Sequence, residues 1–431
     1  MLEMRLNSFK DLKKPVNQIS HFSDREICAG DYLQKFLSII VLPCYYLTMK
    51  IPLVDLRRNI ESIKNDLTSA IERCMENTGF ILGDEVTFFE EEFARYCEVE
   101  YCIGVNSGTD ALHLALRAME IGEGDEIITV PFTFIATAEA IWMTGALPVF
   151  VDIDEDTYTL SPEELRRFLA ERWMDGIDRI TGKRIKGIIP VHLYGHPCNM
   201  EEIMDVAKRY NLYVIEDCAQ AHGARVLFQG KFRRVGSMGN AGCFSFFPAK
   251  NLGAFGDGGA VITSDKMVKE KVFMLRNHGR MEKYDHIMKG FNSRLDSLQA
   301  GILRTKLKHL DAWNERRREI AKRYIKNLSG LNGLVIKKPK EWAEPVYHLF
   351  VIEVEKRGEL QKELSKNGIA TGIHYPIPLH LVKSFEDLGY RKGDFPLSER
   401  CAERVLSLPV FPELRDDEVD KICEVIVKFL S

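Results

Sequence analysis

The sequence lacks several features that define whole classes of protein. Its ten cysteines include no C-x-x-C pair, and its one close histidine pair, His192 and His196, lies in a Gly/Pro turn rather than on a helix face. Structural zinc sites depend on such spacings, so we expect no metal site. Dispersed, unpaired cysteines are typical of a reducing compartment, and we therefore expect a cytoplasmic protein.

A strong charge of one sign is also missing. The 59 basic and 63 acidic residues give a net charge of −4. This balance gives no reason to expect nucleic acid or an anionic membrane as the main partner. A small anionic ligand stays compatible with it, because such a ligand needs only a local group of donors.

Long apolar segments are scarce. The single long run, residues 36–47, is shorter than the roughly 20 residues that span a bilayer, and Pro43 interrupts it. We therefore expect no membrane segment. We also expect Met49 to begin a self-sufficient protein and residues 1–48 to be either an upstream extension of it or the result of a start assigned too early.

What the sequence does contain is an alternation of apolar strands and amphipathic helices. From about residue 100, runs such as EIITV and LYVIED alternate with helical patterns such as MEEIMDVAKRY. Strands that are apolar throughout and separated by helices predict an α/β fold, with a mostly parallel central sheet and helices on both faces. Ligands of such sheets collect beyond the carboxyl ends of the strands.

The pattern changes after Gly290. Residues 295–328 read as a long, charged helical stretch with a solvated basic face, and shorter strands and helices follow it. We expect a large domain over residues 49–306 and a smaller C-terminal α/β domain over residues 307–431.

A first candidate for binding chemistry is the segment VNSGTDALHLAL, residues 105–116. A strand ends at Val105, a glycine-containing turn follows, and a helix begins near Thr109. Free backbone N–H groups and the positive end of a helix dipole together suit a phosphate. The alternative is an ordinary helix N-cap formed by Ser107 or Thr109.

A second candidate is LYVIEDCAQAHGA, residues 212–224. Its apolar residues deliver Glu216 and Asp217 to the end of a buried strand, where a carboxylate needs a partner. A protonated pyridine nitrogen is such a partner, and the pairing keeps the ring electron-withdrawing. Gln220 lies one helical step further on, within reach of a ring hydroxyl. The alternative is an acidic residue that caps the following turn.

A third candidate is CFSFFPAKNLGAFGDGGA, residues 243–260. Lys250 follows a strand and a proline and precedes a glycine-rich stretch. An amine must be neutral to attack a carbonyl, and the neighbouring aromatic residues Phe246, Phe247 and Phe255 are expected to lower its pKa. The glycines allow a flat ligand to approach the backbone. The alternative is a solvated lysine in a surface loop.

Together, in this order, the three segments resemble the fold-type I aminotransferases that use pyridoxal 5'-phosphate (PLP). More narrowly, the sequence resembles the DegT/StrS family of nucleotide-sugar aminotransferases. The resemblance extends from about Ile51 to the C-terminus. It includes the blocks NSGTDAL, PFTFIATAEA, IEDCAQAHGA, FSFFPAKNLGAFGDGGA, GFNSRLDSLQA and IHYPIPLH.

The resemblance implies roles for individual residues. Lys250 is expected to bind PLP as a Schiff base and then to move a proton between the substrate carbon and the cofactor. Asp217 is expected to pair with the ring nitrogen and Gln220 with the ring oxygen. Phosphate contacts are implied for Gly108, Thr109 and Ser245, and ring stacking for Phe134.

Other residues are implied at the border of the site. Asn292 matches an asparagine that reaches the phosphate from the neighbouring subunit, so the resemblance implies a homodimer with a shared active site. Four residues match motifs that border the substrate site in relatives: Arg294, His374, Tyr375 and His380.

The implied reaction is the transfer of an amino group from glutamate to a keto-hexose linked to UDP or dTDP, for amino-sugar biosynthesis. Dehydratase relatives have a histidine where this chain has Lys250, which favours transamination. No sequence pattern distinguishes C3 from C4 amination or one nucleotide from the other. Two alternatives stay open: amination of a cyclic ketone without a nucleotide, and a non-catalytic PLP-binding sensor.

Overall fold

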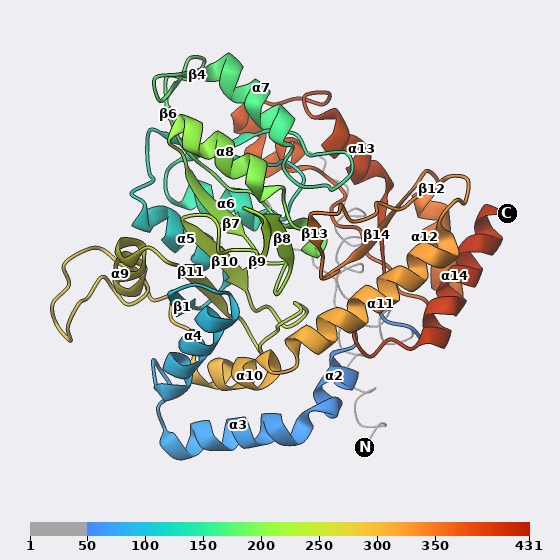
Figure 1. The fold of residues 1–431 in the computed structure, drawn as a ribbon, viewed down its shortest axis with the longest axis horizontal. Coiled ribbons are helices and arrows are strands. Elements are labelled where there is room, and N and C mark those ends of the chain that lie inside the picture. The colour runs from blue at the N-terminus through green and yellow to red at the C-terminus, as the bar shows by residue number, and fades with distance from the viewer. Residues whose placement is uncertain (1–49) are drawn as a thin grey trace, which may run out of the picture. The chain divides into compact units, whose positions relative to one another are not determined.

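The computed structural model describes residues 50–431 (Figure 1). The extension predicted over residues 1–48 and the apolar run at 36–47 lie outside the described residues. The described residues belong to one compact unit, Met49–Ser431, and the domain boundary expected between residues 306 and 307 stays a prediction.

A nine-stranded sheet forms the centre of the fold, with the order β1-β11-β10-β7-β6-β2-β3 along its main path. The strands from β10 to β3 pair in parallel, whereas β11 is antiparallel to both neighbours. The prediction of a mostly parallel sheet is confirmed. The strands are β1 Tyr101–Val105, β2 Asp125–Thr129, β3 Leu147–Phe150, β4 Trp173–Met174, β5 Ile177–Asp178, β6 Arg184–Ile188, β7 Tyr213–Asp217, β10 Ala241–Ser245 and β11 Gly259–Thr263.

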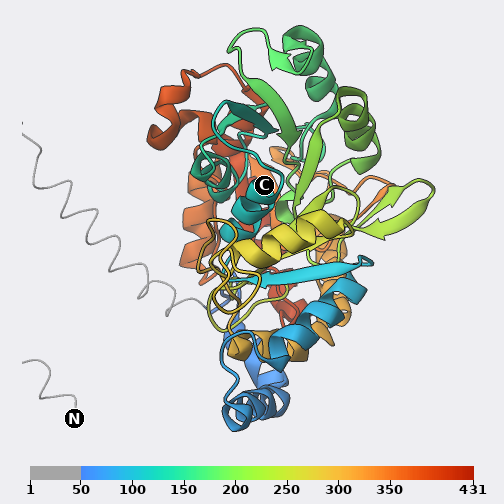
Figure 2. The ribbon, with the colours of Figure 1, turned by 90° about the vertical axis from the view of Figure 1, so that its left-hand side faces the viewer.

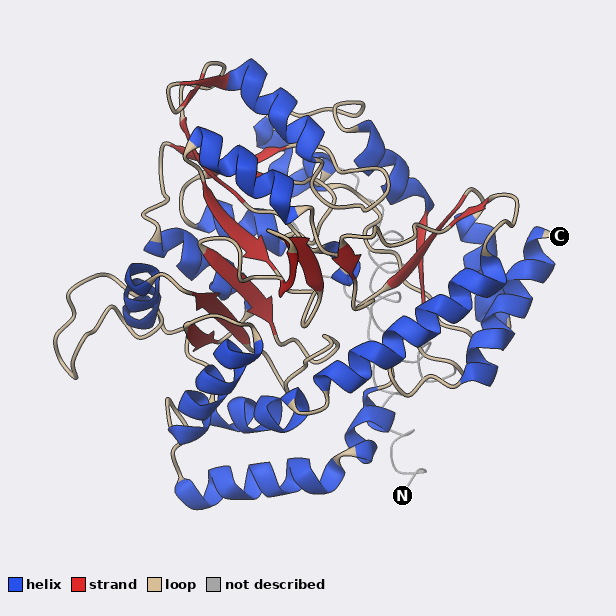
Figure 3. Cartoon of the chain, in the orientation of Figure 1, coloured by secondary structure: helices blue, strands red, loops and turns tan. Residues whose placement is uncertain are grey.

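Both faces of this sheet are buried, which explains why its strands are apolar throughout. Alternate residues of one strand enter different cores: Ile127 packs in one hydrophobic cluster and Ile128 in the other. Figure 3 shows helices on both sides of the strands. The covering helices are α4 Asp84–Tyr96, α5 Gly108–Ala118, α6 Ala136–Met143, α7 Pro162–Arg172, α8 Met200–Tyr210 and α9 Lys266–Leu275.

The carboxyl ends of several strands lie at one edge of the sheet, where the functional site is found. Because β11 runs against both β1 and β10, the strands β1 and β10 are parallel to each other and to β7 and β2. Their carboxyl ends therefore lie at one edge. In the turned view α9 lies beside β1 (Figure 2).

The C-terminal part has its own antiparallel sheet and hydrophobic core. The sheet joins β12 Leu334–Val335, β14 Phe350–Val354 and β15 Val405–Leu408. Its apolar residues pack with those of the surrounding helices in a third cluster. These helices are α11 Leu310–Leu328, α12 Arg357–Lys366 and α14 Asp416–Leu430, and the helix α13 Pro396–Arg404 precedes β15.

The helical stretch expected over residues 295–328 is two helices rather than one. The first, α10 Ser297–Leu307, packs on α4 and on α3 Lys64–Asn77, whereas α11 packs on α14. These partners lie in different directions, so the chain turns at Lys308 and His309. A charge pattern along the sequence does not report such a change of packing partner.

The remaining elements are short. They are α2 Leu56–Ser62, the 3₁₀ turns η3 Leu193–Gly195, η4 Leu379–Leu381 and η5 Lys383–Leu388, and a small sheet of β8 Arg225–Phe228, β9 Lys231–Arg234 and β13 Ala343–Glu344. Within residues 50–431, no helix combines the length and apolar character that crossing a membrane requires.

Candidate active site

A cavity of about 500 Å³ lies at the carboxyl edge of the large sheet. Most residues that the sequence singled out line it, although they come from distant parts of the chain. These are Gly108, Thr109, Phe134, Asp217, Gln220, Ser245, Lys250, His374 and Tyr375.

One end of the cavity is the start of helix α5. Ser107 caps the helix, since its hydroxyl oxygen accepts a hydrogen bond from the Asp110 N–H at 3.1 Å. A Cβ on Gly108 would lie 2.5 Å from the Cβ of Ser245. The absence of a side chain at Gly108 therefore lets the end of β10 approach the helix start. This close approach places the Ser245 side chain beside the free N–H groups of the first helical turn.

At the end of β7 the Asp217 carboxylate is held in a dry environment. Its side chain accepts hydrogen bonds from the Thr137 hydroxyl at 2.8 Å and from the Ala219 N–H at 3.1 Å. Asp217 is only 5% exposed. Burial raises the pKa of Asp217 above its ordinary value, while the two hydrogen bonds and the nearby Lys250 ammonium oppose that rise.

Lys250 lies opposite Asp217 in the same cavity. Burial lowers the pKa of Lys250 to about 8, and the charge of Asp217 acts in the opposite direction. The amine is therefore available in both its neutral and its protonated form near neutral pH. Of the aromatic residues expected around it, Phe246 is fully buried and Phe247 lines the cavity, but Phe255 lies against Lys306 instead.

The loop that carries Lys250 closes tightly on itself. The Lys250 N–H donates to the Phe247 carbonyl oxygen at 2.9 Å, and the Ala254 N–H donates to the Phe246 carbonyl oxygen at 2.8 Å. A Cβ on Gly253 would lie 2.2 Å from the Pro248 carbonyl oxygen. The glycine-rich sequence is thus needed for the loop to fold back under the lysine.

The opposite wall of the cavity contains Gln220, Tyr375 and Phe134. The Gln220 amide oxygen accepts a hydrogen bond from the Tyr194 N–H at 2.7 Å, and its amide nitrogen donates to the Tyr375 hydroxyl at 3.1 Å. Phe134 is 53% exposed, and its ring centroid lies 5.8 Å from that of Tyr375. His374 is anchored beneath, with its Nδ1 2.8 Å from the Ser407 hydroxyl.

Three residues singled out from the sequence lie outside the lining of this cavity. Asn292 is exposed and pairs through its backbone with Asn277. The Arg294 guanidinium donates to the Asn277 side-chain oxygen at 3.0 Å. His380 is buried against Phe395, with its Nε2 3.0 Å from a Glu399 carboxylate oxygen.

The cavity also contains residues that the sequence did not single out. Thr137 belongs to the block PFTFIATAEA and follows Phe134 by one helical turn, so the sequence could have indicated that it lies near Phe134 in the site. Asp257 and His348 line the cavity as well. His348 lies far along the chain from Lys250, in a segment that reads as an ordinary strand start, so no local pattern indicates it.

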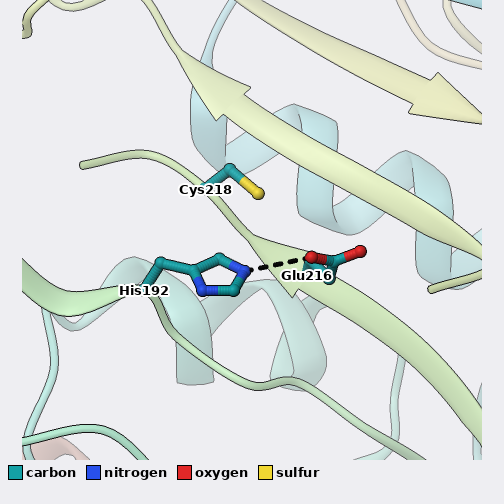
Figure 4. Close-up of side chains that lie close together, drawn as sticks. All are labelled: His192, Glu216 and Cys218. Carbon is teal, nitrogen blue, oxygen red and sulfur yellow. Dashed lines mark hydrogen bonds and ion pairs between the residues drawn. The ribbon is translucent and has the colours of Figure 1, made fainter. Parts of the chain in front are cut away.

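A separate cluster of potential metal ligands lies beneath the cavity. It consists of His192, Glu216 and Cys218, whose ligand atoms lie within 4.8 Å of one another (Figure 4). Glu216 is the neighbour of Asp217, but successive side chains of a strand point to opposite faces. Its side chain therefore points away from the cavity.

The atoms of this cluster already have protein partners. Because the Nδ1 of His192 accepts the Cys198 N–H at 2.9 Å, its Nε2 carries the proton and donates to Glu216 at 3.1 Å. Burial also keeps the pKa of the Cys218 thiol well above its ordinary value. The Glu216 carboxylate further accepts hydrogen bonds from the N–H groups of Gly236, Met238 and Gly239. The donor set thus fastens a loop to β7 and is not arranged for a cation.

The arrangement in the cavity fits PLP. A phosphate would meet the N–H groups of Gly108 and Thr109 and the Ser245 hydroxyl, and a pyridinium nitrogen would meet the buried Asp217 carboxylate. An aldehyde between them would meet the Lys250 amine. The buried Asp217 carboxylate fits a cationic ring, because it lines the cavity and a buried charge needs a partner.

Comparisons with known proteins agree with this chemistry. The sequence model of the DegT/DnrJ/EryC1/StrS aminotransferase family matches residues 61–427. A UDP-N-acetyl-3-dehydro-alpha-D-glucosamine 3-aminotransferase of Acidithiobacillus ferrooxidans is 45% identical, over 88% of this chain and 98% of its own. A dTDP-3-amino-3,4,6-trideoxy-alpha-D-glucose transaminase of Streptomyces venezuelae is 43% identical, over 88% and 96%. A protein of Geobacillus stearothermophilus named pleiotropic regulatory protein is 44% identical, over 88% and 99%.

Solved structures of known proteins also resemble the described fold. The crystal structure of Streptomyces venezuelae DesV, in complex with a ketimine intermediate, has a TM-score of 0.84 and 42% identity, and the match covers 89% of this chain and 99% of that one. The structure of NtdA from Bacillus subtilis, with the bound cofactor PMP, has a TM-score of 0.79 and 30% identity, covering 89% and 85%.

Proposed function

Because the chain belongs to the DegT/DnrJ/EryC1/StrS aminotransferase family, we propose that it moves an amino group from glutamate to a ketone on a UDP- or dTDP-linked hexose. The protein is an aminotransferase of amino-sugar biosynthesis and its cofactor is PLP. The observation that carries the proposal is one cavity in which Lys250 faces a buried Asp217 beside a helix N-terminus.

When bound, PLP supplies an aldehyde that condenses with amines and a cationic ring that withdraws electrons from the substrate carbon. Asp217 would keep a proton at the ring nitrogen through an ion pair that burial strengthens. Gly108, Thr109 and Ser245 would hold the phosphate, and Phe134 would form one wall against the ring. The orientation of Gln220 is fixed by Tyr194, so its amide nitrogen donates to Tyr375. The second N–H of this amide would be available to the ring oxygen of the cofactor.

Lys250 performs the proton transfers of both half-reactions. With a pKa near 8, its amine accepts a proton from the substrate carbon and returns it without a large energetic cost in either direction. In the first half-reaction the donor amino acid loses its amino group and leaves as 2-oxoglutarate. In the second the ketone of the sugar receives that amino group.

A homodimer completes the site in this proposal, with Asn292 reaching the phosphate of the partner. Asn292 is exposed and does not line the cavity of its own chain, which is compatible with such a role. Large apolar side chains that are exposed on α4, α10 and the segments beside them support an interface there. They are Phe80, Ile81, Phe88, Phe255 and Leu298.

Complementation tests the shared site directly. Lys250→Ala and Asn292→Asp variants should each have little activity. After mixing and subunit exchange, heterodimers with one intact site should recover a measurable fraction of it. No recovery, despite proven exchange, would contradict a role for Asn292 in the site of the partner, and an active Asn292→Asp variant would place Asn292 outside the site.

We place the enzyme in the cytoplasm, with soluble substrates and no nucleic acid or membrane partner. The cysteines among the described residues are free and buried, which fits a reducing compartment. A thiol titration of the native protein against the unfolded protein checks this arrangement.

One relative carries a regulatory name, so a PLP-binding sensor is the competing function. The complete set of Lys250, Asp217 and the phosphate contacts favours catalysis. The deciding experiment adds glutamate to the PLP-loaded protein and measures 2-oxoglutarate, and then adds UDP- and dTDP-linked 3-keto and 4-keto hexoses. An enzyme releases 2-oxoglutarate and regains the PLP absorption only with its true acceptor.

Two outcomes would overturn the proposal. A protein that binds PLP but releases no 2-oxoglutarate is not an aminotransferase of glutamate. A protein that completes the first half-reaction but accepts only cyclic ketones without a nucleotide has a different acceptor class.

A further inference from the structure

His348 lines the active-site cavity beside Lys250, and its ring is held in one tautomer by a chain of side-chain amides. The chain starts at Asn314, whose amide nitrogen donates to the His222 carbonyl oxygen at 2.8 Å. A carbonyl oxygen only accepts hydrogen bonds, so the orientation of the Asn314 amide is fixed. Its side-chain oxygen therefore faces Asn251 and accepts from the Asn251 amide nitrogen at 2.9 Å.

The fixed orientation of the Asn251 amide in turn determines the tautomer of His348. Its amide nitrogen also donates to the Val346 carbonyl oxygen at 3.1 Å, so both of its N–H groups are engaged. The Asn251 side-chain oxygen lies 3.2 Å from the Nδ1 of His348. An amide oxygen only accepts, and the proton of the imidazole must therefore be on Nδ1. The Nε2 of His348 carries a lone pair.

The ring is neutral as well as oriented. Burial lowers the pKa of His348 well below its ordinary value, and the cations Lys250 and Arg317 lower it further. Within residues 50–431, Nε2 has no hydrogen-bond partner. The atom is nevertheless not fully buried, so a ligand can reach it. Because His348 lines the cavity, we infer that the accessible Nε2 faces it.

The backbone around His348 is fixed at some cost. Tyr347 has a φ of 45°, a conformation that residues with a side chain rarely adopt. The flanking N–H groups of Val346 and Leu349 donate to Gly195 and Tyr194. Strain that is held in place by surrounding hydrogen bonds is typical of residues positioned for a ligand.

We propose that His348 recognises a hydroxyl group of the acceptor sugar, which donates its hydrogen bond to Nε2. This inference rests on the proposed function, because it assigns one half-reaction to the residue. A hexose offers hydroxyl donors. Glutamate, once its amino group has reacted, offers only carboxylates, which a lone pair repels. His348 is thus a specificity residue for the second substrate.

The test separates the two half-reactions in the PLP-loaded enzyme. His348→Phe removes the acceptor, and the expected loss in kcat/KM for the keto sugar is roughly 2- to 12-fold, the effect of one hydrogen bond. The rate of 2-oxoglutarate release from glutamate should change by less than that. His348→Gln, which can place an amide oxygen near the position of Nε2, should restore part of the loss. His309→Phe, the same exchange outside the cavity, is the control.

Deoxy acceptors sharpen the test. Among sugars that each lack one hydroxyl, one should react equally well with the wild type and with His348→Phe, because the contact is already missing. Equal losses in both half-reactions would overturn the proposal and show that the imidazole acts on the Lys250 amine. The same penalty with every deoxy sugar would also overturn it. A wild type that fails with all keto sugars would instead refute the proposed function.

Discussion

The close approach of Ser245 to Gly108 yields a quantitative prediction. In Gly108→Ala the new methyl carbon would lie 2.5 Å from the Cβ and 3.0 Å from the Cα of Ser245. The end of β10 and the start of α5 must then move apart, and overpacking of this kind costs about 1–3 kcal/mol. If the holoenzyme requires the original geometry, PLP should bind roughly 5- to 140-fold more weakly.

The assay is a titration of the apoenzyme with PLP, followed by the absorbance of the bound cofactor. Gly358→Ala is the control, because a Cβ at that position meets nothing within 4 Å. Its affinity for PLP should equal that of the wild type. An unchanged affinity in Gly108→Ala, in a variant as stable as the wild type, would refute the account of Gly108 as the residue that brings Ser245 to the phosphate.

Three further predictions concern the same cavity. Lys250→Ala should lower turnover by at least roughly 10²–10⁴-fold while the circular dichroism spectrum stays unchanged, and a variant with normal turnover would exclude the lysine as the proton carrier. Because burial lowers the pKa of Lys250 to about 8, the amine is increasingly protonated below pH 8. Borohydride-trapped capture of PLP by the apoenzyme should therefore accelerate about tenfold per pH unit up to pH 8 and then level off, and a flat profile would contradict that pKa. Thr137→Val removes the hydroxyl that donates to buried Asp217 and should cost about 1–3 kcal/mol in urea unfolding. Thr137→Ser, which keeps the hydroxyl, should cost less.

The sequence allowed the central chemistry to be predicted because it follows strand ends. Asp217 and Ser245 are each placed by the last residues of an apolar strand, and Lys250 follows shortly after. In a parallel sheet such ends meet at one edge. The family resemblance, the α/β fold and the aminotransferase function are confirmed by the comparisons and the fold.

Features that depend on packing between distant segments were not predictable in this way. The antiparallel direction of β11 depends on its pairing with β1 and β10, which an apolar run of residues does not encode. The break between α10 and α11 depends on which helices they contact. His348 is placed in the site by contacts with distant segments, including Asn251, and the sequence does not indicate these contacts. The contact of His380 with Glu399 could not be predicted from the sequence either.

The adjacent carboxylates of β7 have a consequence for engineering this enzyme. Glu216 accepts hydrogen bonds from a loop on one side of the sheet, whereas Asp217 faces the active-site cavity on the other side. The two side chains are separated because successive residues of a strand point to opposite faces. One residue inserted or deleted within Tyr213–Asp217 would turn each of these two side chains to the opposite face of the sheet. The loop would lose its hydrogen bonds to Glu216, and the cavity would lose the carboxylate of Asp217. Libraries aimed at new acceptor sugars should therefore leave this strand untouched and vary the wall around Phe134 and Tyr375.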